Sequence, residues 1–211
     1  MKLPAWWSAV CCILGFGVLA PCWAAPPVEG TTRLLEGQIL RGRFEQERYL
    51  QGFQAPLKST GTFLLVPARG LVWRTEVPFA VTTVISPAGL MQEVHGRETT
   101  RIPAAKLPFM SKLYAMLSGT MTGDWSALAS TFKVVRTPEA KGWNLQLTPL
   151  NADDPNLPIQ SIRARGGRLL AEIELVKPHG DRDRLVFVDQ KIETGQPAAQ
   201  EAALLEAANA K

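Results

Sequence analysis

The stretch GTFLLVPARGLVWRTE, residues 61–76, decides the fold predicted from this sequence. Its first part is rich in apolar and β-branched residues, as strands are, and it ends at Pro67. The segment from Pro67 to Gly70 has the composition of a tight turn. After the turn, alternation places Leu71, Trp73 and Thr75 on one face of an extended chain. The stretch therefore predicts two antiparallel strands joined by a short turn.

Similar strand-like runs, bounded by turn residues, occur along most of the chain. They cover residues 44–50, 79–86, 90–95, 98–102, 132–136, 143–150, 159–165, 169–176 and 184–189. Gly166-Gly167 predicts a hairpin with a two-residue turn. A meander of this length has to curl, and its concave face needs a cover.

Three segments predict helices, and one further segment predicts an unstructured end. Residues 28–40 carry a modest apolar stripe, and residues 124–129 follow an Asp that can cap a helix. Residues 108–118 have apolar side chains at helical spacing, namely Phe109, Leu113, Met116 and Leu117. The middle helices are the natural cover for the concave face. The Ala-rich tail, residues 195–211, is predicted to be frayed or disordered.

The amino-terminal segment, residues 1–24, has the pattern of a cleaved export signal. It combines Lys2, an apolar run shorter than the roughly 20 residues that span a bilayer, and small residues at Ala24 and Ala25. All 3 cysteines of the chain lie within it, so the predicted mature domain cannot form disulfides or use thiolates. Removing Lys2 lowers the net charge from +4 to +3, and the remaining charges are interleaved, which argues against nucleic-acid binding.

The order of motifs between Gly42 and Pro78 resembles that of the LolA family of periplasmic lipoprotein carriers and its LolA-like relatives. In that family a Phe-x-Gln lies on the first strand, a glycine opens the second, and a proline turn leads to a strand that ends in Trp and a polar residue. A proline followed by an aromatic residue comes next in the family. The matching pieces here are, in the same order, Phe44-Glu45-Gln46, Gly61, Pro67, Trp73-Arg74 and Val77-Pro78-Phe79. The resemblance extends more loosely to about Glu193, so residues 25–194 are expected to form one domain.

The resemblance implies an α+β fold: an unclosed antiparallel half-barrel of about ten or eleven strands, with helices covering its concave face. It also implies a monomer in the periplasm that binds acyl chains of a lipoprotein or other lipid in an apolar cavity. An inner-membrane donor and an outer-membrane acceptor would be its partners. No cofactor, metal or catalytic residue is expected.

Two departures from the family pattern favour a diverged relative, and with it a lipid client other than a lipoprotein. The carrier proper has an Arg-Pro pair whose arginine helps to hold a helical lid closed. Here Val66 precedes Pro67, and Arg69 is the nearest candidate for the lid contact. The chain also ends in its Ala-rich tail where the carrier has a further strand.

Candidate ligand-binding residues follow from the apolar positions of the strands and of the predicted lid helix, residues 108–118. They are Phe63, Leu65, Leu71, Trp73, Phe79, Met91, Phe109, Leu113, Met116 and Leu117. A carrier needs many weak apolar contacts so that its client can leave, and flexible methionines suit variable chains. Each of these residues could equally be part of an ordinary core.

Two other functions remain open at this point: a lipid-sensing or scaffolding module of the cell envelope, and an enzyme built on the same fold. His95 and His179 have no metal-binding spacing, so loop positions are expected for them. Asp181 and Asp183 are expected to serve turns, since no calcium-loop spacing is present. The sequence has no nucleophile motif, although a triad assembled in space would leave no such trace.

Overall fold

The computed structural model describes residues 34–106, 126–139, 142–152, 154, 157 and 159–210. The predicted export signal and the predicted lid helix lie outside the described residues. No helix within the described part is long and apolar enough to cross a membrane.

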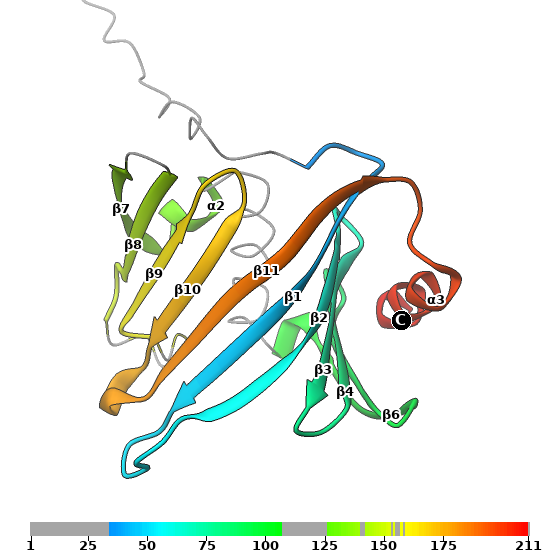
Figure 1. Cartoon of the computed structure of the whole chain (residues 1–211), viewed down its shortest axis with the longest axis horizontal. Coiled ribbons are helices and arrows are strands. Elements are labelled where there is room, and N and C mark those ends of the chain that lie inside the picture. Colours follow the sequence, from blue (N-terminus) through cyan, green and yellow to red (C-terminus); the bar gives the residue numbers. More distant parts are fainter. Residues whose placement is uncertain are drawn as a thin grey trace, which may run out of the picture.

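Eleven strands form one antiparallel sheet that does not close (Figure 1). They are β1 (Gln38–Tyr49), β2 (Leu57–Val66), β3 (Gly70–Val77), β4 (Val81–Ser86), β5 (Gly89–Val94), β6 (Arg97–Pro103), β7 (Phe132–Glu139), β8 (Gly142–Pro149), β9 (Ser161–Gly166), β10 (Leu170–Val176) and β11 (Arg182–Thr194). The curled sheet confirms the predicted half-barrel.

The strand order is β6-β5-β4-β3-β2-β1-β11-β10-β9-β8-β7. Two meanders, which we call the first arm (β1–β6) and the second arm (β7–β11), therefore meet where β1 pairs with β11. The short helices η1 (Ala104–Lys106) and α2 (Ser126–Ala129) lie next to the two edge strands in the chain, after β6 and before β7. The opening of the half-barrel thus lies between two strands that are consecutive in sequence.

The two faces of the sheet carry separate apolar clusters, because alternate residues of a strand point to opposite faces. The inner cluster spans both arms and includes Phe44, Phe63, Leu65, Leu71, Trp143, Leu147, Ile162 and Phe187. We call the face that bears it the inner face. The outer face has a smaller cluster, the α3 patch, formed by Ile39, Leu64, Val66, Val72, Val84 and Met91.

Part of the Ala-rich tail forms the helix α3 (Ala199–Asn209), and this helix covers the α3 patch. It packs against β3, β4 and β5 on the outside of the first arm (Figure 1). Leu205 and Ala208 are buried there, and the Ser86 hydroxyl donates a hydrogen bond to the Ala208 carbonyl at 3.2 Å. The prediction of a frayed or disordered tail is therefore wrong for residues 199–209, because tertiary packing stabilises a helix that would be marginal alone.

Two further predictions need correction. Gln38–Leu40 belongs to β1, where it pairs with residues 192–194 of β11, and not to a helix. The β9–β10 hairpin is present, but its turn spans residues 167–169 rather than two residues. The helix predicted for residues 124–129 is confirmed at Ser126–Ala129.

Candidate functional site

Four aromatic side chains gather on the inner face where the two arms meet. We call Phe44, Phe63, Trp73 and Phe187 the aromatic cluster. The Phe44 and Trp73 rings are stacked with their centroids 3.7 Å apart. Phe187 meets Phe63 edge-on at 5.4 Å and Trp73 edge-on at 6.2 Å. Such geometries add to the stabilisation that burial of the rings already provides.

Gly61 makes room for this cluster. It lies opposite Phe44 in the β1–β2 ladder, at a register shift between β2 and β3. A Cβ atom at this position would collide with the carbonyl oxygen of Arg74 and lie 3.0 Å from the Phe44 ring. Only glycine therefore lets β3 approach and the Phe44 ring lie over the strand.

Aliphatic side chains continue the apolar surface on both sides of the aromatic cluster. Leu40, Leu65, Leu147 and Leu170 have no exposed surface at all. Trp143 on β8 is buried as well, and its indole N–H donates a hydrogen bond to the Gly167 carbonyl at 2.8 Å. The indole ring therefore adds to the apolar surface with its polar group already paired.

Histidine and acidic side chains are the possible metal-binding groups in the part of the chain that the structure describes. Within the described residues, no three His, Asp or Glu side chains lie close enough to hold a metal ion. His95 lies in the β5–β6 turn, and His179 lies in the short 3-10 segment η2 (Pro178–Gly180) between β10 and β11. Both are exposed and have left-handed φ angles, 53° and 72°, which confirms the loop positions expected for them. Around the aromatic cluster, the inner face therefore offers apolar contacts.

The structure brings together four of the predicted ligand-binding residues on the inner face: Phe63, Leu65, Leu71 and Trp73. Phe79 stands apart in the β3–β4 turn and is 77% exposed. Phe109, Leu113, Met116 and Leu117 lie outside the described residues.

Met91 and Arg69 are placed differently from the prediction. Met91 belongs to the α3 patch on the outer face, because its neighbour Leu90 takes the inner-facing position of β5. Arg69 contacts α3, with its guanidinium 3.8 Å from the Glu206 carboxylate and its carbonyl accepting a hydrogen bond from the Asn209 amide. Its described contacts therefore lie on the outer side of the first arm.

The sequence prediction omitted Phe44 and Phe187 from the site. Phe44 carried part of the family motif, and its ring could have been assigned to the inner face from the alternation of β1. Phe187 is flanked by Val186 and Val188, so the run LVFVD gives no indication of which face is apolar. Only the pairing of Phe44 with Phe187 places the second ring.

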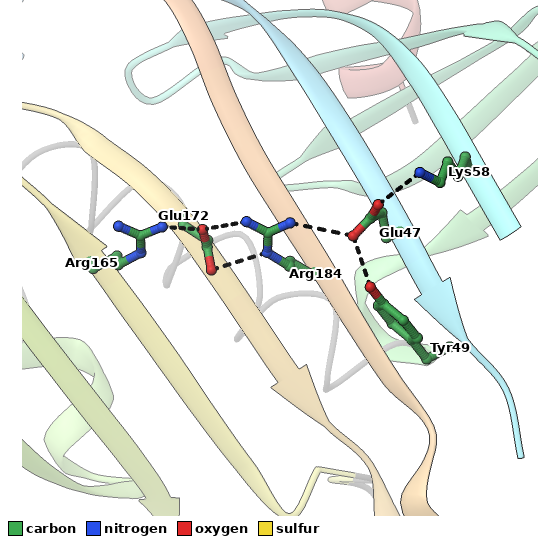
Figure 2. A network of polar contacts seen from close by, with 6 residues as sticks. All are labelled: Glu47, Tyr49, Lys58, Arg165, Glu172 and Arg184. Atoms are coloured by element: carbon green, nitrogen blue, oxygen red, sulfur yellow. Dashed lines mark hydrogen bonds and ion pairs between the residues drawn. The ribbon is translucent and has the colours of Figure 1, made fainter. Parts of the chain in front are cut away.

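Charged residues lie on the opposite, outer face and form a network across five strands. Glu172 on β10 forms ion pairs with Arg165 and Arg184, and Arg184 forms a further ion pair with Glu47 (Figure 2). The N–O distances to Glu172 are 2.6 Å from Arg165 and 3.0 Å from Arg184. Glu47 is bound in addition by Lys58 and by the Tyr49 hydroxyl. These six residues are called the charge network below.

The charge network holds its carboxylates ionised. Burial alone would raise the pKa of Glu172, but the hydrogen bonds from Arg184 and Arg165 lower it overall. The Tyr49 hydroxyl and Lys58 lower the pKa of Glu47. The outer face of the second arm is therefore a hydrated, ionic surface, distinct from the apolar inner face.

Comparison with known sequences identifies the family. The profile of the family described as "Outer membrane lipoprotein carrier protein LolA-like" matches residues 32–211. The chain belongs to this LolA-like family. The matched range includes α3, so the family domain extends through the tail. None of the curated protein sequences matches the chain.

Several solved structures are similar to this LolA-like chain at low sequence identity. A putative outer membrane lipoprotein-sorting protein domain from Vibrio parahaemolyticus is 11% identical, with a TM-score of 0.39, over 82% of this chain and 93% of that chain. A LolA superfamily protein from Nitrosomonas europaea is 7% identical, with a TM-score of 0.38, and the match covers 80% of this chain and 90% of that chain. A chain of the MucA/MucB complex of Pseudomonas aeruginosa is 16% identical, with a TM-score of 0.40, and the match covers 78% of this chain and 55% of that chain.

Proposed function

We propose that this LolA-like protein is a carrier of the bacterial periplasm that holds acyl chains of a lipoprotein or another lipid against its inner face. It delivers them towards an acceptor in the outer membrane. The observation that carries the proposal is the apolar inner face, which runs across both arms through the aromatic cluster. Family membership supports the same class of protein.

Weak contacts of this kind suit transport. An acyl chain gains about 0.8 kcal/mol for each CH₂ group buried in a membrane. A surface of aliphatic and aromatic side chains offers a comparable gain, and it places no fixed charge that would retain the acyl chain itself. The client is therefore released when a membrane or acceptor offers an equal environment.

Entry of the client requires a movement. Leu65 and Leu147 have no exposed surface, so an acyl chain reaches them only after the half-barrel opens. In this proposal the predicted lid helix, residues 108–118, opens and closes the site. Its position in the sequence fits that role. It lies between η1, which follows the edge strand β6, and α2, which precedes the edge strand β7.

The first test is native mass spectrometry of the protein purified from the periplasm without detergent, followed by organic extraction. We expect a discrete added mass that extracts as a lipid or an acylated species. A protein without added mass, unchanged after incubation with lipids and acylated peptides, would contradict the proposal.

A second test locates the client on the inner face. Lipids with brominated acyl chains quench tryptophan fluorescence on contact, so they are expected to quench the wild-type protein. Trp73→Phe keeps an aromatic ring in the cluster and should reduce this quenching while lipid is still bound, whereas Trp143 on the same face should still be quenched. Equal quenching in both proteins would place the acyl chains away from Trp73.

A further inference from the structure

The inner face changes character along β1. Leu40, Phe44, Gln46 and Arg48 all point to this face because they are separated by even numbers of residues. Over these eight residues, about 26 Å at the usual rise per residue, the side chains change from aliphatic to aromatic, then to amide, then to cationic. The inner face therefore has one apolar end and one charged end.

The partners of β1 show the same change. Phe44 pairs with Phe187 of β11. Gln46 pairs with Leu185 of β11 and with Ser59 of β2, and it accepts a hydrogen bond from the Ser59 hydroxyl at 3.2 Å. Two residues further along β1, on the same face, Arg48 pairs with Asp183 of β11. Polar groups thus occupy the inner face next to the aromatic cluster, at the end where the β1–β2 and β10–β11 hairpins lie (Figure 1).

Asp183 organises this end by holding two cations. Its side chain is 9% exposed, and its two carboxylate oxygens bind Arg48 Nε at 2.8 Å and Lys177 Nζ at 2.5 Å. Arg48 and Lys177 remain 47% and 34% exposed. Among the described residues no partner binds the Nη1 and Nη2 groups of Arg48. The three residues carry a net positive charge with hydrogen-bond donors still available.

We propose that Arg48 and Lys177 bind the anionic headgroup, a phosphate or carboxylate, of an amphipathic guest whose hydrocarbon part lies on the aromatic cluster. This inference rests on the proposed function and adds the headgroup chemistry of the client. A guanidinium presents paired N–H groups that match an oxyanion, and an ammonium adds a point charge. Asp183 fixes both cations in position but neutralises only one of them.

The test compares guests that share dioleoyl chains and differ only in the headgroup. The purified full-length protein is incubated with vesicles that contain phosphatidylglycerol, phosphatidylcholine or diacylglycerol, and bound lipid is measured by native mass spectrometry. We expect phosphatidylglycerol to bind about tenfold more tightly than diacylglycerol, a difference of about 1.4 kcal/mol. This preference should fall as salt is added, because the cations are partly exposed.

Variants assign the preference to the two cations. Arg48→Gln and Lys177→Gln should each reduce the preference to about threefold or less, whereas Arg48→Lys should keep most of it. Arg43→Gln is the matched control, since it removes the same charge from the outer face of the same strand. Arg48→Gln and Lys177→Gln each leave Asp183 with one cation. Circular dichroism verifies that all four variants fold.

The outcomes separate the headgroup inference from the proposed function. If no lipid binds, the proposed function fails. If diacylglycerol and phosphatidylglycerol bind equally, or if Arg43→Gln lowers the preference as much as Arg48→Gln, the headgroup inference is wrong while the apolar site stands. If inorganic phosphate alone binds and Arg48→Gln abolishes that binding, the cations serve a free anion, and this also overturns the inference.

Discussion

The outer face of the sheet is built in two different ways. In the first arm it carries the α3 patch, where Leu64, Val66 and Val84 are buried under a helix. In the second arm it carries part of the charge network, in which Glu172 is shared by Arg165 and Arg184 (Figure 2). The apolar cluster of the inner face spans both arms, so this difference concerns the outer face alone.

This contrast explains two patterns in the sequence. The run Phe63-Leu64-Leu65-Val66 is apolar at every position because β2 is buried on both faces. The run from Glu172 to Val176 alternates instead, because β10 keeps a hydrated outer face. In β2 the continuous apolar run therefore coincides with the part of the outer face that α3 covers.

The largest expected effect is the loss of packing under α3. Leu205 is 1% exposed within the α3 patch, so Leu205→Ala should lower the free energy of unfolding by about 2–4 kcal/mol. Urea unfolding measures this change. Glu206→Ala, at the neighbouring exposed position, is the control and should change it by less than about 0.5 kcal/mol. Equal effects of the two variants would show that α3 is not docked in solution.

Acid should release the same helix. Burial raises the pKa of Glu201, but hydrogen bonds from Arg41 and the Ala198 N–H lower it below its ordinary value of 4.5. Because the folded-state pKa is depressed, this stabilisation is present above pH 4.5 and is lost as the pH falls through the folded-state value. We expect a loss of about 1 kcal/mol.

Hydrogen exchange of the α3 amides from pH 6 down to pH 3 measures this release. The protection of α3 should fall in wild type over the acid range, while that of β8, which carries no acidic side chain, stays unchanged. Glu201→Gln should remove the pH dependence. An acid response of α3 that persists in Glu201→Gln would assign it to another group.

A smaller effect is expected in the charge network. Glu172→Gln removes the ionic partner of Arg165 and Arg184 but leaves every apolar contact in place, so it should cost up to about 1 kcal/mol at low salt. At 1 M salt most of this cost should vanish because partly exposed charges are screened. Leu205→Ala should cost the same at both salt concentrations, which makes it the control. A salt-independent cost for Glu172→Gln would contradict the ionic description of this surface.

The smallest effect concerns Arg69, the residue that the sequence suggested as a lid contact. Its guanidinium lies 3.8 Å from the largely exposed Glu206, so Arg69→Gln should change the unfolding free energy by less than about 0.5 kcal/mol. Asn209→Ala removes the hydrogen bond to the Arg69 carbonyl at 3.0 Å and should cost more. Thermal unfolding of both variants ranks them, and the reverse order would show that the Arg69 side chain has a stronger partner.

The strands and the family could be predicted from the sequence because both depend on local patterns. The Gly61–Trp73 region combines strand-forming residues, a turn and the family motif within a short stretch. Phe63, Leu65 and Trp73, which the sequence suggested as ligand-binding residues, lie together on the inner face, and ligand binding by them stays a prediction. Strand ends were harder, since Gln38 and Ile39 pair only with Thr194 and Glu193 at the other end of the domain. Neither segment indicates its partner locally.

The face of each residue and the docking of α3 could not be predicted. Met91 is flanked by Leu90 and Gln92, and only the pairing of β5 with β4 shows that Met91 faces outward. The tail offers Leu204 and Leu205 among many alanines, so its own pattern is weakly amphipathic. Its helix forms because the α3 patch is available, which is a property of distant strands.

The pairing of the first strand with the last has a consequence for how the chain folds. Gln38 pairs with Thr194, so the ladder that unites the two arms joins residues from opposite ends of the domain. Contacts of such large sequence separation slow folding, because the loop-closure entropy is lost before the contacts form. Each meander can assemble locally, but the aromatic cluster draws Phe44 from β1 and Phe187 from β11. The surface proposed to hold the client is therefore completed only when β11 has been added to the sheet.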